Sequence, residues 1–506
     1  MNGEILAFAI YFVAMLMVGF IFFIKSKNNG EKGYFLGNRQ MGPWVTAMSA
    51  QASDMSAWLL MGLPGSIFAF GFGQAWIGIG LALGTILNWI IVAKRLRKFS
   101  KASGDSITLP QYLTNRFLKK SMALKIICDI VFLVSFTLYV ASAFSAGAKV
   151  FTQIFENLSN QNAMIIFALI ILVYTFLGGY KAVCWTDFFQ GMLMLVALLA
   201  VPLVILAFQN TDAKLLNDTV AIGKDSFTFI PDFLKASPKE IISGLAWGLG
   251  YFGMPHILVR FMAIEKPSMV KKSVIVASVW IVLALGATIV LSYLARMFVM
   301  ADGKDFATYL LGEVGNREMI FVVLARKLFP AFISGILLSA IIAASMSTAD
   351  SQLLVASSSF TSDIYKPVFR KNASEKELLW VGRLVVIIVS VVAFFIASSK
   401  SENAAVIMNL VSNAWGLFGA AFGPVILLSL FWKRFTYIGA IAGIVVGALT
   451  DILWFIYLST STGIYEILPG FILGFIACVV FSLIDKKPSK EVYALYENAT
   501  SSNIDD

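Results

Sequence analysis

The sequence predicts an all-α polytopic membrane protein, and three observations lead to that fold class. Of the 506 residues, 59% are hydrophobic and 13% are charged, whereas soluble domains carry roughly 25% charged residues. Apolar runs recur along the chain at the length that a helix needs to cross a bilayer, about 20 residues. Two of these runs are interrupted by glycine, proline and polar residues, which membrane helices tolerate only where protein or a water-filled cavity surrounds them.

Charged and Gly/Pro-rich joints divide the chain into thirteen predicted spans, whose bounds are 4–24, 41–68, 72–93, 123–153, 162–180, 187–207, 241–262, 272–295, 330–356, 378–397, 404–431, 435–458 and 463–484. If Met1 lies outside, most of the 39 Lys and Arg residues fall in inner loops. The positive-inside rule then predicts an outer N-terminus and a cytoplasmic C-terminus. The net charge of +10 therefore reflects topology, and no nucleic acid is expected as a partner.

The first interrupted helix lies within residues 41–68. It contains an ionisable residue, Asp54, among small polar residues, and Gly62 and Pro64 follow. Ionisable groups inside a membrane are costly and usually mark an ion or substrate path. The alternative is a kinked helix whose serines bond to their own turn and whose Asp54 faces the headgroups.

The second interrupted helix spans Ser243–His256 and contains four glycines and one proline. Trp247 and Tyr251 are four residues apart and lie on one helical face, while Pro255 removes a backbone donor. A glycine-rich helix can also be a packing surface. However, the two interrupted segments are the second and seventh predicted spans, as two inverted five-helix repeats (spans 2–6 and 7–11) would require.

A third segment, Leu337–Gln352, is rich in small polar residues and contains the adjacent hydroxyls of Ser347 and Thr348. Hydroxyls and freed backbone carbonyls are oxygen ligands of the kind that hard cations take. In membrane helices such hydroxyls also bond back to their own turn. This segment therefore predicts a cation site only in combination with the interrupted helix at 41–68.

The chain offers little for catalysis or transition-metal binding. Its single histidine is His256, and its cysteines, Cys128, Cys184 and Cys478, are far apart. Zinc and iron sites recruit several His or Cys ligands, and no catalytic dyad is evident. We therefore expect that the protein is not an enzyme, that it needs no cofactor, and that it binds no metal other than sodium.

Five runs resemble the sodium/solute symporter family, and the match covers nearly the whole chain. They are Gln51–Gly65, Gly178–Gly179 with Trp185–Asp187, Trp247–Ala263, Ala343–Leu354 and Trp415–Pro424. The runs at 53–58 and 247–256 are most similar to the proline-transporting bacterial members. The resemblance implies a LeuT-like core of five plus five helices, with broken first helices in each repeat, one helix before the core and two after it.

The resemblance also implies the domain boundaries and the cellular location. The expected parts are an extra helix and inner loop (1–40), the first repeat (41–207), an outer loop (208–240), the second repeat (241–431), two further helices (432–484) and a cytoplasmic tail (485–506). The protein would lie in the plasma (inner) membrane of a bacterium. The lipid bilayer is an expected partner, and no obligate protein partner is evident.

The implied function is secondary active transport, in which inward sodium flow drives uptake of L-proline by alternating access. Carried over residue by residue, sodium would bind the backbone carbonyls of Ala52, Met55 and Ala344 and the hydroxyls of Ser347 and Thr348. Asp54 and Asp187 would serve sodium coupling. Proline would contact Ser56, Ala57, Trp58, Tyr139, Trp247, Tyr251 and Pro255.

The residues leave the exact solute open. A zwitterion with an apolar ring suits N–H groups freed at a broken helix, which attract a carboxylate, and aromatic faces, which attract an ammonium. Pantothenate or another small carboxylate would also fit, and Ala57 stands where similar proline symporters often carry glycine. An ion channel is the less favoured class, because a channel would not need an occluding aromatic pair.

Overall fold

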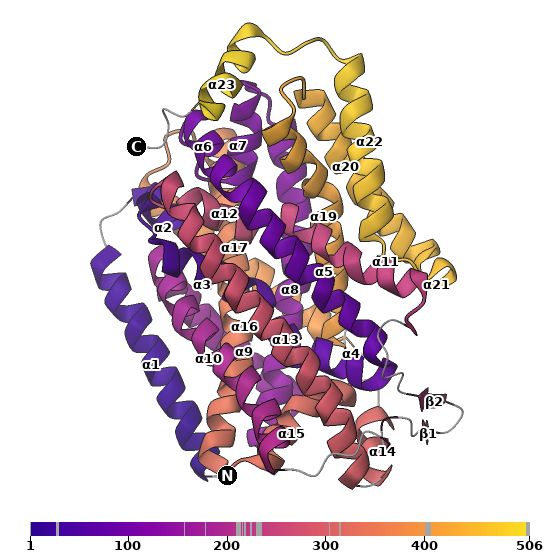
Figure 1. Ribbon diagram of the computed structural model, residues 1–506. Helices are drawn as coiled ribbons and strands as arrows, with labels where there is room; N and C mark the ends of the chain where they lie inside the picture. Colours follow the sequence, from indigo (N-terminus) through magenta and orange to yellow (C-terminus); the bar gives the residue numbers. More distant parts are fainter. Residues whose placement is uncertain are drawn as a thin grey trace.

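The computed structural model describes residues 2–26, 30–155, 157–177, 179–208, 214, 216, 219–222, 225–228, 235–302, 304–312, 315–399 and 406–501. Met1, Gly178, about half of the predicted outer loop 208–240 and the last five residues of the predicted tail lie outside these residues. The described chain forms one elongated helical bundle (Figure 1). Helix α1 begins at one end of the bundle, and α23 lies at the opposite end.

The helices of the first half are α1 (Asn2–Ser26), α2 (Gly30–Leu36), η1 (Gly37–Arg39), α3 (Pro43–Met55), η2 (Ala57–Leu59), α4 (Gly62–Phe70), η3 (Phe72–Gln74), α5 (Ala75–Leu87), η4 (Asn88–Ala93), α6 (Lys94–Ala102), α7 (Leu109–Arg116), α8 (Ala123–Ile154), α9 (Asn160–Leu177) and α10 (Tyr180–Phe208). Two short strands, β1 (Thr219–Ile222) and β2 (Asp225–Thr228), then pair antiparallel, with Thr219 opposite Thr228.

The helices of the second half are α11 (Pro238–Ala246), η7 (Trp247–Phe252), α12 (Pro255–Ala263), η8 (Pro267–Met269), α13 (Val270–Asp302), α14 (Lys304–Gly312), η9 (Asn316–Met319), α15 (Ile320–Leu328), α16 (Ala331–Ser359), η10 (Phe360–Phe369), α17 (Glu375–Ala397), α19 (Ile407–Phe431), α20 (Tyr437–Tyr457), α21 (Ser459–Thr462), α22 (Ile467–Ile484) and α23 (Lys490–Thr500). The η segments are 3₁₀-helical except η4 and η10, which are π-helical.

The prediction of an all-helical membrane protein is confirmed. Among the described residues, ten helices are long and apolar enough to cross a membrane, or up to eleven if the bent pair Pro238–Phe252 and Pro255–Ala263 is one span. Two shorter apolar helices cover Ala57–Phe70 and Asn160–Phe176. The count of thirteen spans stays a prediction.

Helix α3 ends where the sequence places small polar residues. Ser56 follows it with φ 42° and ψ −176°, and its Oγ accepts a hydrogen bond from the backbone N–H of Trp58 at 3.1 Å. A positive φ is strained for a residue with a Cβ, so the side-chain bond helps to hold this turn. Further on, a Cβ at Gly62 would approach Cδ1 of Trp58 to 2.8 Å. Only glycine therefore lets α4 pass beside that ring.

The second irregular stretch has a different construction. Helix α11 begins with a capping box between Ser237 and Glu240 and continues into the six-residue 3₁₀ segment η7. Pro255 stands in the first turn of α12, where its missing N–H costs no intrahelical bond. The axis bends by 44° between the two parts. A Cβ at Gly250 would overlap the Trp415 indole, 2.1 Å from Nε1, so glycine permits this close packing.

These two irregular stretches meet in the middle of the bundle. Helix α3 packs against α10, α12, α13 and α16, and η7 packs against α5 and α19. Helix α16 also contacts α1 and α8, while α20 and α22 pack on each other and on α19. The end of α3 therefore lies inside the bundle, among these helices.

Candidate functional site

Three of the predicted sodium ligands come together between α3 and α16. The Ser347 hydroxyl lies 2.9 Å from the carbonyl oxygen of Ala52 and 3.2 Å from that of Ala344. All three residues are fully buried. The carbonyl of Ala52 belongs to the last turn of α3, where the helix itself supplies no partner for the final four carbonyls. A hydroxyl hydrogen can point to only one of these two carbonyls at a time, so oxygen lone pairs are in excess here.

The remaining two predicted ligands flank this group. Thr348 is fully buried, and its Oγ1 has no hydrogen-bond partner among the described residues. Met55, the last residue of α3, is also buried, and its carbonyl belongs to the same unsatisfied final turn. A buried polar atom without a partner is costly. The arrangement of uncharged oxygens therefore suits a small hard cation, which would take the unused lone pairs.

Asp54 lies beside this group and turns toward η7. Its Oδ2 accepts a hydrogen bond of 2.6 Å from the Tyr251 hydroxyl, while Oδ1 has no partner among the described residues. The backbone carbonyl of Tyr251 in turn accepts from Nδ2 of Asn88 at 2.9 Å. The hydrogen bond between Tyr251 and Asp54 links the 3₁₀ segment η7 with the end of α3. The two irregular stretches are therefore joined through the Asp54 carboxyl group.

Asp187, the second predicted coupling residue, lies in an ion-paired network. Its Oδ2 is 2.9 Å from Nη2 of Arg260 and accepts a 2.6 Å hydrogen bond from Ser49. Arg260 also donates from Nε to Ser49 at 2.9 Å and from Nη2 to Ser351 at 2.5 Å. Its Nη1 donates to the carbonyl of His256 at 2.7 Å. Helices α3, α10, α12 and α16 are therefore held together through one buried arginine.

Arg260 is not among the site residues predicted from the sequence, although the sequence contains a signal for it. Arginine is rare within apolar spans and pairs with a carboxylate or backbone carbonyls when it occurs there. Arg260 is 1% exposed, and all three of its guanidinium nitrogens have hydrogen-bond partners, which offsets the cost of burying the charge. Its presence in the run Trp247–Ala263 could have indicated a buried acidic partner, without saying which one.

The predicted substrate residues Trp58 and Trp247 stack on each other, with ring centroids 5.5 Å apart. Trp247 also stacks on Tyr465 at 5.0 Å and lies 6.4 Å from Trp415. Trp415 donates from Nε1 to the carbonyl of Trp247 at 2.8 Å and meets the Tyr251 ring edge-on at 5.0 Å. We call these five residues, Trp58, Trp247, Tyr251, Trp415 and Tyr465, the aromatic cluster. Tyr465 and Trp415 are not among the site residues predicted from the sequence.

The other predicted substrate residues lie around this cluster, and Ser56 is bonded to it through the backbone N–H of Trp58. Ser56 and Ala57 are buried at the turn after α3, and Pro255 is buried at the start of α12. Tyr139 of α8 is 1% exposed, and its hydroxyl has no partner among the described residues. Its ring centroid is 6.5 Å from that of His256. Tyr139 of α8 thus lies near the first turn of α12.

A cavity of 510 Å³ reaches the aromatic cluster from the surface. Trp247 and Tyr465 line it together with Met408, whose Sδ accepts from Nε1 of Trp58 at 2.7 Å. Charged residues at the cavity include Glu240, Arg317 and Glu466. Two of the stacked rings, those of Trp247 and Tyr465, therefore form part of the wall of this cavity.

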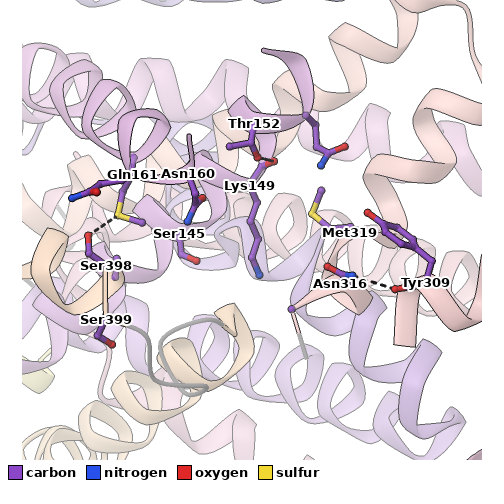
Figure 2. Close-up of a pocket in the computed structure, with 14 residues that line it drawn as sticks. Ser145, Lys149, Thr152, Asn160, Gln161, Tyr309, Asn316, Met319, Ser398 and Ser399 are labelled. Carbon is purple, nitrogen blue, oxygen red and sulfur yellow. Dashed lines mark hydrogen bonds between the residues drawn. The ribbon is translucent and has the colours of Figure 1, made fainter. Parts of the chain in front are cut away.

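A larger cavity, of 780 Å³, lies elsewhere and contains none of the predicted site residues (Figure 2). It is lined by α8, α9, η9 and the end of α17, with Ser145, Lys149 and Thr152 on α8. Lys149 forms a 2.7 Å ion pair with the buried Glu318, which also accepts from the N–H groups of Ile407 and Met408 at the start of α19. Size alone therefore does not identify the candidate site.

The opposite end of the site is closed by arginines. Arg39 donates to Asp105 at 2.8 Å, to the carbonyl of Ser106 at 2.7 Å and to the carbonyl of Met262. Arg97 donates to the carbonyl of Ile264 at 2.6 Å. Partial burial disfavours the ionised Asp105, but the hydrogen bond from Lys32 and the charge of Arg39 outweigh it and lower the pKa of this carboxyl. Hydrogen bonds from Arg39 thus join the segment before α3 to the end of α12, and its ion pair with Asp105 joins that segment to the loop after α6.

Comparisons with known proteins identify the type of molecule. Residues 34–447 match the model of the sodium:solute symporter family. A sodium/proline symporter of Escherichia coli K12 is 44% identical over 98% of this chain and 96% of its own. A high-affinity proline transporter of Bacillus subtilis, PutP, is 43% identical over 94% of this chain and 97% of its own. An osmoregulated proline transporter of B. subtilis, OpuE, is 40% identical over 97% of both chains.

Solved structures add the overall fold. A Na⁺-coupled sialic acid symporter in a substrate-bound outward-open state has a TM-score of 0.73 at 19% identity, covering 96% of this chain and 99% of its own. MhsT in complex with L-phenylalanine has a TM-score of 0.55 at 14% identity, covering 87% and 97%. These likenesses indicate the general architecture of LeuT-like transporters. The predictions of a transporter and of its family are confirmed: the chain is an integral membrane protein that belongs to the sodium:solute symporter family.

Proposed function

We propose that this protein is a secondary active transporter that couples inward sodium flow to the uptake of L-proline by alternating access. Relatives named for sodium and proline cover nearly the whole chain at 44% and 42% identity. Within the molecule, the observation that carries the proposal is the uncharged oxygen group of Ala52, Ala344 and Ser347 at the end of α3. Sodium is a co-transported ligand here, and no cofactor is needed.

The proposed sodium site uses the carbonyls of Ala52, Met55 and Ala344 and the hydroxyls of Ser347 and Thr348. The Ser347 hydroxyl would keep its proton but rotate, so that its oxygen and the two carbonyl oxygens face sodium, and the unpartnered Thr348 Oγ1 would also bind the ion. Because these ligands come from α3 and α16, binding would fix the end of α3 against α16. The same end carries the turn at Ser56, so sodium would order the solute pocket.

The proposed proline site lies between that turn and the aromatic cluster. The carboxylate would meet N–H groups near Ser56 and Ala57, where the chain changes from α3 to η2. The secondary ammonium and the ring would lie against Trp58, Trp247 and Tyr251, with Tyr139 and Pro255 completing the wall. A cation–π contact of this kind is worth about 0.5–2 kcal/mol.

The two proposed coupling residues would act in different ways. Proline bound against Tyr251 would affect Asp54, because the 2.6 Å hydrogen bond between Tyr251 and Asp54 joins η7 to α3. Asp187 would act on the path of sodium, about one helical turn from the proposed sodium site. There Arg260 and a passing sodium ion would compete for the Asp187 carboxylate. Opening the aromatic cluster would expose the site to the outer cavity, and opening the Arg39 and Arg97 contacts would expose it to the other side.

The finer architecture is part of the proposal. The two shorter apolar helices and the bent pair would complete thirteen spans, with inverted repeats at 41–207 and 241–431 and irregular first helices in each. The N-terminus would be outside and residues 485–506 cytoplasmic in a bacterial plasma membrane. The end that carries α6 and α7 would face inward, because its basic residues follow the positive-inside rule.

The energetics require only one sodium ion per proline. A membrane potential of roughly 100 mV contributes about 2.3 kcal/mol per charge, and a tenfold sodium gradient adds about 1.4 kcal/mol. Together they permit accumulation of about 500-fold. A zwitterion carries no net charge, so the coupled step would be electrogenic.

The experiment is uptake of labelled L-proline into proteoliposomes that contain the purified protein. An inward sodium gradient should drive uptake, and an interior-negative potassium diffusion potential should increase it. Unlabelled proline should compete, whereas pantothenate in the same excess should not. Uptake that is unchanged without sodium contradicts the coupling, and the absence of any proline uptake contradicts the substrate. Liposomes without protein supply the background.

A further inference from the structure

A separate cavity of 630 Å³ lies at the end of the molecule that carries α7 and α23. Three segments line it: residues 117–121 after α7, residues 435–438 at the start of α20, and residues 485–489 between α22 and α23. Val492 of α23 completes the lining. This cavity shares no residue with the candidate sodium and proline sites.

The cavity has an excess of positive charge. Lys119, Lys486 and Lys487 line it, and none of their ammonium groups has an ion-pair partner in the part of the chain that the structure describes. The only acidic residue in the lining is Asp485, whose Oδ1 accepts from the backbone N–H of Lys486 at 2.8 Å. Three lysines against one aspartate give a site that favours an anion.

Two helix N-termini add to this preference. Thr436 is the N-cap of α20, and its side chain accepts from the N–H of Gly439. Ser489 is the N-cap of α23. Both residues line the cavity, and the first-turn N–H groups of a helix carry partial positive charge. The anion would therefore meet backbone donors as well as ammonium groups.

Apolar and aromatic residues also line the cavity, beside the polar Ser121, Thr436 and Ser489. The Phe117 ring packs edge-on against Phe435 at 5.5 Å and against Tyr437 at 6.2 Å. Next to the lysines, Leu118 is 51% exposed and Ile484, at the end of α22, is 77% exposed. A soluble phosphate would use only the charged part of this surface, whereas a phospholipid would use both parts.

We propose that this cavity binds an anionic glycerophospholipid. Its headgroup phosphate would lie among Lys119, Lys486 and Lys487, and its acyl chains would cover Leu118 and Ile484. Basic pockets between membrane helices bind anionic headgroups in this way. The site is a structural lipid site, and it does not depend on the identity of the transported solute.

The bound lipid would hold the C-terminal helix in place. Residues 485–489 lead directly into α23, and Tyr496 of that helix accepts a 2.9 Å hydrogen bond from Arg95 of α6. The guanidinium of Arg116 lies 5.0 Å from the centre of the Tyr496 ring. Arg95 and Arg116 also donate to the carbonyls of Leu430 and Ser429 at the end of α19. Lipid at the cavity would thus support a contact between α23 and a helix of the core.

The test uses the purified full-length protein in phosphatidylcholine nanodiscs with increasing fractions of phosphatidylglycerol. We expect phosphatidylglycerol to raise the melting temperature and to remain bound in native mass spectra. The triple variant Lys119→Gln/Lys486→Gln/Lys487→Gln should melt normally in pure phosphatidylcholine and bind phosphatidylglycerol about 100-fold more weakly. The arginine triple variant Lys119→Arg/Lys486→Arg/Lys487→Arg should retain the preference.

A matched control removes the same charge elsewhere. Lys266→Gln/Lys271→Gln/Lys272→Gln neutralises three exposed lysines, one before α13 and two in its first turn, and should keep the full phosphatidylglycerol effect. An equal loss in this control would overturn the proposal in favour of general surface charge. Equal competition by free glycerol phosphate would overturn it in favour of a soluble anion. Unchanged lipid binding by the glutamine triple variant would also reject the site.

Discussion

Two buried clusters lie one helical turn apart on the same pair of helices, and they differ in charge. The first joins Ala52 of α3 to Ser347 of α16 through uncharged oxygens. The second joins Ser49 of α3 to Ser351 of α16 through the ion pair of Asp187 with Arg260. The first leaves the Thr348 hydroxyl without a partner among the described residues, whereas the second supplies its own cation.

This difference shows how one scaffold can serve two purposes. A cluster of neutral oxygens gains from an added cation, because the cation supplies the missing partner. A buried carboxylate that already has a guanidinium gains less, because its charge is compensated. We therefore expect mutations in the first cluster to change sodium affinity and mutations in the second to change stability first.

The largest effect is expected for Arg260→Ala. Removing the guanidinium leaves the buried Asp187 uncompensated, which should cost about 3–5 kcal/mol of folding free energy. Thermal and denaturant unfolding of the detergent-purified variant would measure the loss. The double variant Arg260→Ala/Asp187→Asn should recover part of it, since the orphaned charge is gone. A single variant as stable as the wild type would show that the ion pair does not hold these helices together.

Trp247→Ala should act on proline and leave sodium binding nearly unchanged. It removes an apolar wall and a cation–π partner, so proline affinity should fall about tenfold or more, equivalent to at least about 1.4 kcal/mol. Proline-induced stabilisation in a thermal-shift assay gives this affinity. Because Trp247 also stacks on Trp58 and Tyr465, a lowered melting temperature with intact proline affinity would instead indicate a packing residue.

Tyr251→Phe should have the smallest effect of the three. It removes only the hydroxyl that donates to Asp54, and one such bond contributes about 0.5–1.5 kcal/mol. Proline affinity at saturating sodium should fall between about 2-fold and 12-fold. Tyr437→Phe is the matched control, because the Tyr437 hydroxyl bonds to the backbone of Leu124 away from the site. Equal losses of proline affinity in both variants would contradict a specific role for the Asp54–Tyr251 bond.

The sequence could predict the first cluster better than the second, for a physical reason. Helical periodicity and breaker residues show where a helix is interrupted, and α3 does end at Met55 beside Ser56. The family resemblance then proposed Ala52, Ala344 and Ser347, which the structure places within hydrogen-bond distance. Periodicity assigns a residue to a face of its own helix but does not identify the residue across from it. Arg260 and Asp187 are 73 positions apart, so their pairing depends on how α10 and α12 pack.

The aromatic cluster illustrates the same limit. Trp247 and Tyr251 were predictable as neighbours on one face because they are four residues apart. Tyr465 precedes α22 and reaches Trp247 from more than 200 positions away, with ring centroids 5.0 Å apart. It lies in a helix–helix connection, and its sequence surroundings contain no pattern that marks a binding residue. Only the packing of α22 against η7 and α19 brings it to the site.

The most direct test of the proposed sodium site is equilibrium sodium binding to Thr348→Ala in the absence of proline. The variant loses one of about five oxygen ligands, so sodium affinity should fall by about 1–3 kcal/mol, or roughly 5-fold to 150-fold. Ser345→Ala is the matched control on α16, because its hydroxyl bonds within its own helix to the carbonyl of Ile341, and its sodium affinity should stay within about twofold of the wild type. Sodium affinity that is unchanged in Thr348→Ala, or equally reduced in both variants, would contradict the proposed site.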